Sequence, residues 1–363
     1  MKIIKITKLL ILLGVSLCAE ELVYGQNDVH AFLPKEKDID LSISLSKVND
    51  TLDIFNIKES EFGSSGLDTK SLGDMDGVKI DLGYTFDDKL YLHSSFSQKK
   101  LEYSGSTLVN YNLDLYLRYQ FYNQENMAFS IDGGYTSNSA KDTYIRDIKS
   151  INRVLKNFSS GKNIKIKEVD DYYRVSYQDK NGVIRSLDLK NKPYIAIVNT
   201  DDESFYSRVI GSLKKEKWLF DTYLGYREIK IQNQTDSSLL DEADPKLKKE
   251  LSKINFSQNR TDGMLFGGIG VAYKIDDKFD TAFNYQYNKM LRIDCLEETE
   301  MNHIFNVDLS YKIEKDWSIF IKTQLMLNQF NGEIPYLYSN YTKTTFDHKY
   351  GFVRLGVNHT LHR

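Results

Sequence analysis

The chain has little cysteine, little proline and no long apolar run, and each shortage excludes a class of structure. Of its two cysteines, Cys18 lies in a predicted export signal and only Cys295 lies beyond it, so an intramolecular disulfide is excluded in the mature chain. No run of about eighteen apolar residues occurs, which excludes helical membrane spans. All four prolines lie outside the alternating segments described below, as hydrogen bonding within a sheet requires: Pro34, Pro193, Pro245 and Pro335.

Charge and motif content exclude further classes of function. The formal net charge is −3, which gives no electrostatic argument for nucleic acid as a partner. No metal-ligand spacing occurs, so we expect no metal and no cofactor. The sequence Gly267-Gly268-Ile269-Gly270 has the alternation of a strand and not of a phosphate loop. It places Gly268, Gly270 and Ala272 on one face, where they are expected to leave room.

The N-terminus predicts export. Basic residues at positions 2, 5 and 8 precede a short apolar core at 9–17, and small residues follow. Cleavage after Cys18 or Ala19 gives a signal peptide of residues 1–19; a buried first helix is the alternative. Residues 20–37 are then expected to form an N-terminal periplasmic segment.

About twelve segments alternate between apolar and polar residues. In segment 108–122, Leu113 and Leu117 lie on one face and Asp114 and Arg118 on the other. A helix would spread this pattern around its surface, whereas a strand separates it. The segments lie near 38–48, 77–86, 89–99, 108–122, 126–137, 204–213, 217–231, 261–275, 278–291, 300–313, 316–330 and 349–361.

Short and long connections alternate between these segments. Five are tight turns, such as Asp87-Asp88-Lys89, and each has aromatic residues beside it on the apolar face. This pattern is typical of the periplasmic end of a transmembrane barrel, because amphipathic rings lie at the headgroup level. The expected aromatic girdle consists of Tyr84, Phe86, Tyr119, Phe121, Trp218, Phe220, Tyr273, Phe279, Tyr311 and Trp317.

Two of the long connections are long enough to fold. Residues 138–203 show a helical pattern followed by a hairpin around Asn181-Gly182, a preferred hairpin turn. Residues 232–260 contain a charged, helix-like stretch. We therefore predict an all-β fold, an antiparallel up-and-down transmembrane barrel of about 12 strands over 38–361. Residues 138–203 form a small α+β extracellular loop over or in its mouth. Counting the hairpin as barrel strands gives the 14-strand alternative, which its many charges disfavour.

The last segment extends the argument to a class of protein. Residues 349–357 are similar to the terminal strand that the barrel-assembly machinery recognises, although the chain ends in Leu361-His362-Arg363 and not in an aromatic residue. The chain as a whole resembles Gram-negative outer-membrane β-barrel proteins, and medium-size porins in particular. The resemblance implies Sec-type export to the outer membrane and contact with its lipids and lipopolysaccharide. It also implies assembly by the barrel-assembly machinery and small polar solutes as further partners.

The polar face of the segments is expected to line a pore. The candidate pore-lining residues are Asp81, Asp114, Arg118, Asp132, Arg227, Lys274, Asp280, Asp308, Lys322 and Arg354. Across tight turns, opposed side chains share a face. This parity pairs one acid with one base in three hairpins: Arg118 with Asp132, Lys274 with Asp280, and Lys322 with Asp308. Such pairing predicts a nearly neutral wall and weak ion selectivity. The alternative is a lumen filled by side chains or by loop 138–203.

The sequence contains no catalytic constellation, so we predict no enzyme. A lipase-type barrel needs a His–Ser pair on the lipid face. His303 and His359 fall on that face, but on non-adjacent segments and with no serine at usable spacing. His93 is inward, but no acid pair stands out beside it. The predicted function is a porin-like channel for passive diffusion of small hydrophilic solutes. The alternative is a closed barrel that displays its loops for adhesion or surface binding.

Overall fold

The computed structural model describes most of the chain beyond its N-terminus. The described residues are 29–48, 75–103, 106–149, 151–152, 155, 164–179, 181–242, 245, 247–248, 258–291, 301–327 and 350–362. The predicted signal peptide, residues 1–19, lies outside these ranges, and so does Cys295.

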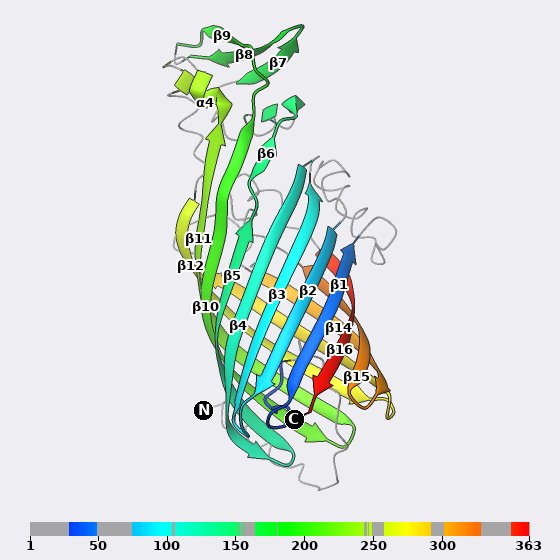
Figure 1. The fold of residues 1–363 in the computed structure, drawn as a ribbon. Helices are drawn as coiled ribbons and strands as arrows, with labels where there is room; N and C mark the ends of the chain where they lie inside the picture. The colour runs from blue at the N-terminus through cyan, green and yellow to red at the C-terminus, as the bar shows by residue number, and fades with distance from the viewer. Residues whose placement is uncertain are drawn as a thin grey trace.

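Twelve of the described strands form a closed antiparallel barrel (Figure 1). Consecutive strands pair with one another, β5 pairs with β10, and β1 pairs with β16 to close the ring. The strands are β1 (Ile39–Val48), β2 (Met75–Thr85), β3 (Leu90–Tyr103), β4 (Ser106–Gln124), β5 (Met127–Ala140), β10 (Ile195–Lys215), β11 (Trp218–Ser237), β12 (Gln258–Lys274), β13 (Phe279–Leu291), β14 (Met301–Glu314), β15 (Trp317–Leu327) and β16 (Tyr350–Leu361). The predicted twelve-strand barrel is confirmed.

The barrel turns its apolar face outward. In β1, Ile43 and Leu45 are 51% and 62% exposed, whereas Ser42 and Ser44, which alternate with them, are buried. This inversion of a soluble fold fits a barrel in lipid, where the closed ladder satisfies every backbone group and the outer face contacts hydrocarbon. Among the described residues, no helix is both long and apolar enough to span a membrane.

The predicted girdle residues lie beside the tight turns, on the outer face. Rings from neighbouring strands contact one another, with centroids 4.4 Å apart for Trp218 and Tyr273 and 4.7 Å apart for Phe279 and Tyr311. Trp218 remains 41% exposed to the outside. The contact of these rings with lipid headgroups stays a prediction.

Residues of the two long connections fold together into a subdomain, whose extracellular position stays a prediction. It contains the three-stranded sheet of β7 (Lys165–Val169), β8 (Tyr172–Gln178) and β9 (Ile184–Leu189), with α4 (Ser238–Glu242) from the second connection. A short strand, β6 (Thr143–Ile145), pairs with β10. The two connections share an apolar core of Ile151, Leu155, Ile164, Ile166, Val175, Tyr177, Leu189, Ile195, Leu239 and Leu247.

The subdomain confirms one sequence prediction and corrects two. The hairpin turns at Asn181-Gly182, and Gly182 has a φ of 80°, a left-handed conformation that suits glycine. Its strands β8 and β9 pair with β7 and not with the barrel, so the 14-strand alternative is wrong. The described part of loop 138–203 also does not close the mouth. Figure 1 shows β7–β9 and α4 at the far end of β10 and β11, beyond the ends of the other strands.

Candidate functional site: the barrel lumen

A cavity of about 350 Å³ lies inside the barrel. Five of the predicted pore-lining residues line it: Asp114, Arg227, Asp308, Lys322 and Arg354. The other five also occupy inward-facing positions, but Asp81, Arg118 and Asp132 are buried against their neighbours. Lys274 and Asp280 lie next to the tight turn that joins β12 and β13. The structure thus divides the predicted set into a cavity surface and a supporting layer.

The predicted strand register is confirmed in all three hairpins. Arg118 lies opposite Asp132 and binds it with two hydrogen bonds, of 2.7 and 3.0 Å. Lys322 lies opposite Asp308, with 3.1 Å between Nζ and a carboxylate oxygen.

The third hairpin keeps its register, and its lysine contacts the adjoining turn. Lys274 lies opposite Asp280, and its Nζ lies 3.1 Å from the carboxylate of Asp277 in that turn. Parity predicts the facing residue, but it does not predict this contact with the turn carboxylate.

Asp132 supports a second arginine that the sequence analysis missed. The Nε of Arg208 donates a 2.7 Å hydrogen bond to Asp132, whose side chain is fully buried. One carboxylate therefore binds two guanidinium groups, Arg118 and Arg208, and a unit positive charge remains. The signal was present in the sequence, because Arg208 has the same parity as the inward residues of its strand.

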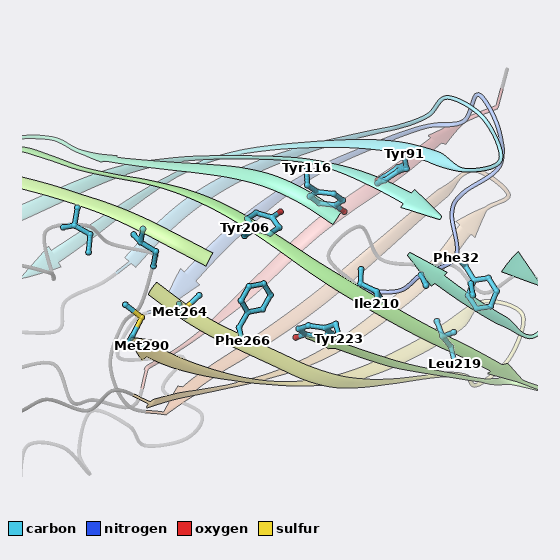
Figure 2. Packing of buried hydrophobic residues seen from close by; sticks show 14 residues of the cluster. Phe32, Tyr91, Tyr116, Tyr206, Ile210, Leu219, Tyr223, Met264, Phe266 and Met290 are labelled. Carbon is cyan, nitrogen blue, oxygen red and sulfur yellow. The ribbon is translucent and has the colours of Figure 1, made fainter. Parts of the chain in front are cut away.

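The arginines alternate with aromatic rings across the wall formed by β4, β5, β10, β11 and β12. Arg118 and Arg208 lie 5.2 and 5.4 Å from the ring centre of Tyr116. Arg227 lies 4.9 Å from the ring of Tyr206. Figure 2 shows the rings inside the barrel. We call this row the arginine–aromatic ladder: Arg118, Tyr116, Arg208, Tyr206, Arg227 and Phe266.

The cavity surface is basic. Six basic residues line it, namely Lys79, Lys99, Arg208, Arg227, Lys322 and Arg354. The acids among its lining residues are Asp114 and Asp308. Asp81 and Asp132 lie behind the bases that they bind and are not among the lining residues. The cavity surface is therefore more basic than the nearly neutral wall that the pairing alone predicts, because two of the paired acids lie behind it.

The three histidines considered as catalytic candidates have other contacts. His93 is buried in the lumen, 3.6 Å from Asp81 and stacked on Tyr116 at 4.7 Å between ring centres. His303 shares a 2.9 Å hydrogen bond with Tyr285, and His359 stacks on Trp317. The three lie on β3, β14 and β16. The structure therefore brings no two of them together.

The N-terminal residues enter the lumen near the tight turns. Backbone atoms of this segment bind inward-facing side chains: the carbonyl of His30 accepts from Arg118 at 2.6 Å, and that of Ala31 accepts from Gln120 at 2.8 Å. The Ala31 amide donates to Ser212 at 2.6 Å. Phe32 is 5% exposed. The described part of the predicted periplasmic segment therefore narrows this end of the barrel.

Comparison with known proteins agrees with this geometry. A model of the oligogalacturonate-specific porin family (KdgM) matches residues 215–332. No curated protein sequence matches the chain.

Several solved barrels are similar over most of their length. The translocator domain of the autotransporter NalP from Neisseria meningitidis has 7% identity and a TM-score of 0.47, over 89% of this chain and 88% of that one. The NanC porin has 10% identity and a TM-score of 0.41, over 89% of this chain and 100% of that one. The KdgM porin in complex with disordered oligogalacturonate has 12% identity and a TM-score of 0.38, over 90% of this chain and 99% of that one. The family match and the closed twelve-strand barrel identify the chain as a porin-like outer-membrane β-barrel protein of a Gram-negative bacterium.

Proposed function

We propose that the protein is a channel for passive diffusion of small hydrophilic solutes and that anionic sugars are its preferred class. The observation that carries the proposal is the cavity surface, with six basic residues against two acidic ones. A lumen lined by one sign of charge raises the local concentration of the opposite sign. The matching family is described as specific for oligogalacturonate, and each sugar unit of such a chain carries a carboxylate.

The ladder suits carboxylated sugars for a second reason. Guanidinium groups bind carboxylates in a planar, two-point geometry, and Arg208 is held in place by Asp132 and by the Tyr116 ring. A fixed donor loses little side-chain freedom when a solute arrives. Successive bases along the wall let a solute exchange one contact for the next, so binding stays weak enough for release. No catalytic step is part of this proposal.

Planar bilayers test the proposal directly. The refolded protein should form channels, and a potassium chloride gradient should give a reversal potential of the sign expected for anion preference. Liposome swelling should be faster with short galacturonate oligomers than with neutral oligosaccharides of equal length. Arg227→Gln should reduce this difference, whereas Arg174→Gln, on the subdomain, should not. Cation preference, or equal rates for both sugars, would contradict the proposal.

The extracellular subdomain favours a second role in surface binding. Its separate apolar core and its position at the far end of β10 and β11 suit a recognition module that does not act through the lumen. Replacing residues 142–194 by a short linker should then abolish binding of whole cells to surfaces and leave single-channel conductance unchanged. Contact with lipopolysaccharide and the barrel-assembly machinery stays a prediction for both roles.

A further inference from the structure

Aromatic rings inside the barrel lie over glycines of neighbouring strands. A Cβ added at Gly134 would lie within 3.0 Å of the Tyr206 ring, and one at Gly268 would meet the Tyr223 ring in the same way. Both pairs are direct cross-strand partners. Gly225 and Phe266 form a third such pair. We call them the glycine–ring pairs.

The three pairs belong to one wall of the cavity. Their rings come from β10, β11 and β12, and all three rings line the cavity. Figure 2 shows Tyr206, Tyr223 and Phe266 close to one another beside the green and yellow strands. Each ring covers the space that a side chain on the glycine would fill, so it lies along the wall. The small inward residues expected to leave room, such as Gly268, instead receive a neighbouring ring.

The rings also carry the ladder. Arg227 stacks on both Tyr206 and Phe266, and the Tyr223 hydroxyl lies 3.0 Å from a side-chain oxygen of Gln286 across the wall. A ring forced off its glycine would move into the cavity and displace the guanidinium group stacked on it. The width of the cavity and the position of its charges therefore depend on the same glycines.

We propose that the glycine–ring pairs set the bore of the channel. Each glycine lets a large ring lie against the wall, which keeps the ring as a contact surface without letting it obstruct the path. The aromatic ring in turn covers a glycine backbone, a known stabilising arrangement in sheets. This inference rests on the proposed channel function.

Gly134 gives the clearest test of the three. The three atoms nearest to its added Cβ all belong to the Tyr206 side chain, whereas those at Gly268 and Gly225 include backbone oxygens. The adjacent Gly133 is a matched control, because a Cβ there would meet nothing within 4 Å. Neither glycine has a positive φ, since Gly182 is the one such glycine among the described residues.

Single-channel conductance of the full-length protein in planar bilayers tests the proposal. Gly134→Ala should conduct less than the wild type, whereas Gly133→Ala should match it. Adding Tyr206→Ala to Gly134→Ala should restore conductance to the level of Tyr206→Ala alone, because the methyl group acts through the ring.

The outcomes separate this inference from the proposed function. A wild-type protein that inserts but does not conduct would contradict the channel function itself. A conducting wild type with an unchanged Gly134→Ala conductance would overturn the glycine–ring inference alone. If Gly134→Ala does not fold, the conductance of the double variant can still be compared with that of Tyr206→Ala, and this comparison tests the inference. Unequal conductances would show that the methyl group acts without the ring.

Discussion

The barrel interior and the subdomain differ in the side chains that they bury, because the barrel buries charged groups beside apolar ones, whereas the subdomain core is apolar. The barrel buries Asp132, Arg118 and Asn302 to 2% exposure or less. The subdomain buries Ile151 and Val175 completely. The barrel can hold a polar interior because its closed hydrogen-bond ladder and its outer lipid face stabilise it. A three-stranded sheet outside the membrane has no such support and needs an apolar core.

The comparison predicts where each region is vulnerable. A lost charge should damage the barrel and spare the subdomain, and a lost methyl group should do the reverse. Three substitutions and one change of pH test this expectation, and each substitution has a counterpart in the other region or on an exposed surface.

Asp132→Ala should have the largest effect. It leaves the guanidinium groups of Arg118 and Arg208 buried without their shared carboxylate, and breaking a buried ion pair costs about 3–5 kcal/mol. The free energy of unfolding can be measured in urea, with heat-modifiable gel migration as the signal for the barrel. Asp188→Ala removes the partner of the exposed Arg174 and should change it little. An equal loss of unfolding free energy in Asp132→Ala and Asp188→Ala would refute the distinction between the two regions.

Ile166→Ala should weaken the subdomain and spare the barrel. Ile166 is 1% exposed in the subdomain core, and truncation of a buried isoleucine costs about 2–5 kcal/mol. Limited proteolysis should cut the subdomain faster while the barrel band keeps its heat-modifiable migration. Ile184→Ala is the control, since Ile184 is 77% exposed. A barrel that unfolds with the subdomain would show that the two regions are coupled.

Gln120→Ala should loosen the N-terminal segment at the end of the barrel. The substitution removes the hydrogen bond from Gln120 to the Ala31 carbonyl, and such a bond stabilises the bound segment by about 0.5–1.5 kcal/mol. Mean single-channel conductance should rise as the segment leaves the lumen more often. Gln178→Ala removes a similar amide-to-carbonyl bond, to Gly182 in the subdomain, and should leave conductance unchanged. No change in Gln120→Ala would mean that the segment does not limit flow.

Acidification should have the smallest effect, on the subdomain hairpin. Asp179 accepts hydrogen bonds from Arg185, Asn181 and Val183, and the Arg185 bond leads in lowering the pKa of Asp179. Its folded-state pKa is below its unfolded value, so its contribution is present above the unfolded pKa, about 4. It is lost as the pH falls through the folded pKa. Hydrogen exchange at the backbone amides of Asn181 and Val183 should accelerate as the pH falls through the folded-state pKa of Asp179. Asp179→Asn should remove this pH dependence.

The alternation in the sequence predicts the barrel because lipid and lumen impose a strict period of two. The same rule fails at the start of β10, which begins at Ile195 although the lipid-type pattern begins near residue 204. Residues 199–203 are all polar, and outward Glu203 is exposed, so this part of the strand has no apolar face. Pairing with β11 and β5 supports it.

The remaining misses depend on contacts between distant segments. Strand β7 alternates over only five residues, and its core partners Leu239 and Leu247 come from the second connection. The N-terminal segment has no periodic pattern, and its partners Arg118 and Ser212 lie 88 and 181 positions away. In the lumen, parity predicts the facing pairs, but it cannot show which base turns toward the cavity.

The length of β10 determines how far the subdomain projects beyond the membrane-spanning part of the barrel. Its 21 residues, at about 3.3 Å each, make a strand about 70 Å long, or about 50 Å along the axis at a tilt of about 40°. The apolar band of such barrels is about 25 Å tall. In the predicted orientation, with the tight turns in the periplasm, an antibody, phage or host surface would reach the subdomain first, while the lumen lies recessed below it. Selection for altered antigenicity can thus act on the subdomain without changing the permeability of the barrel.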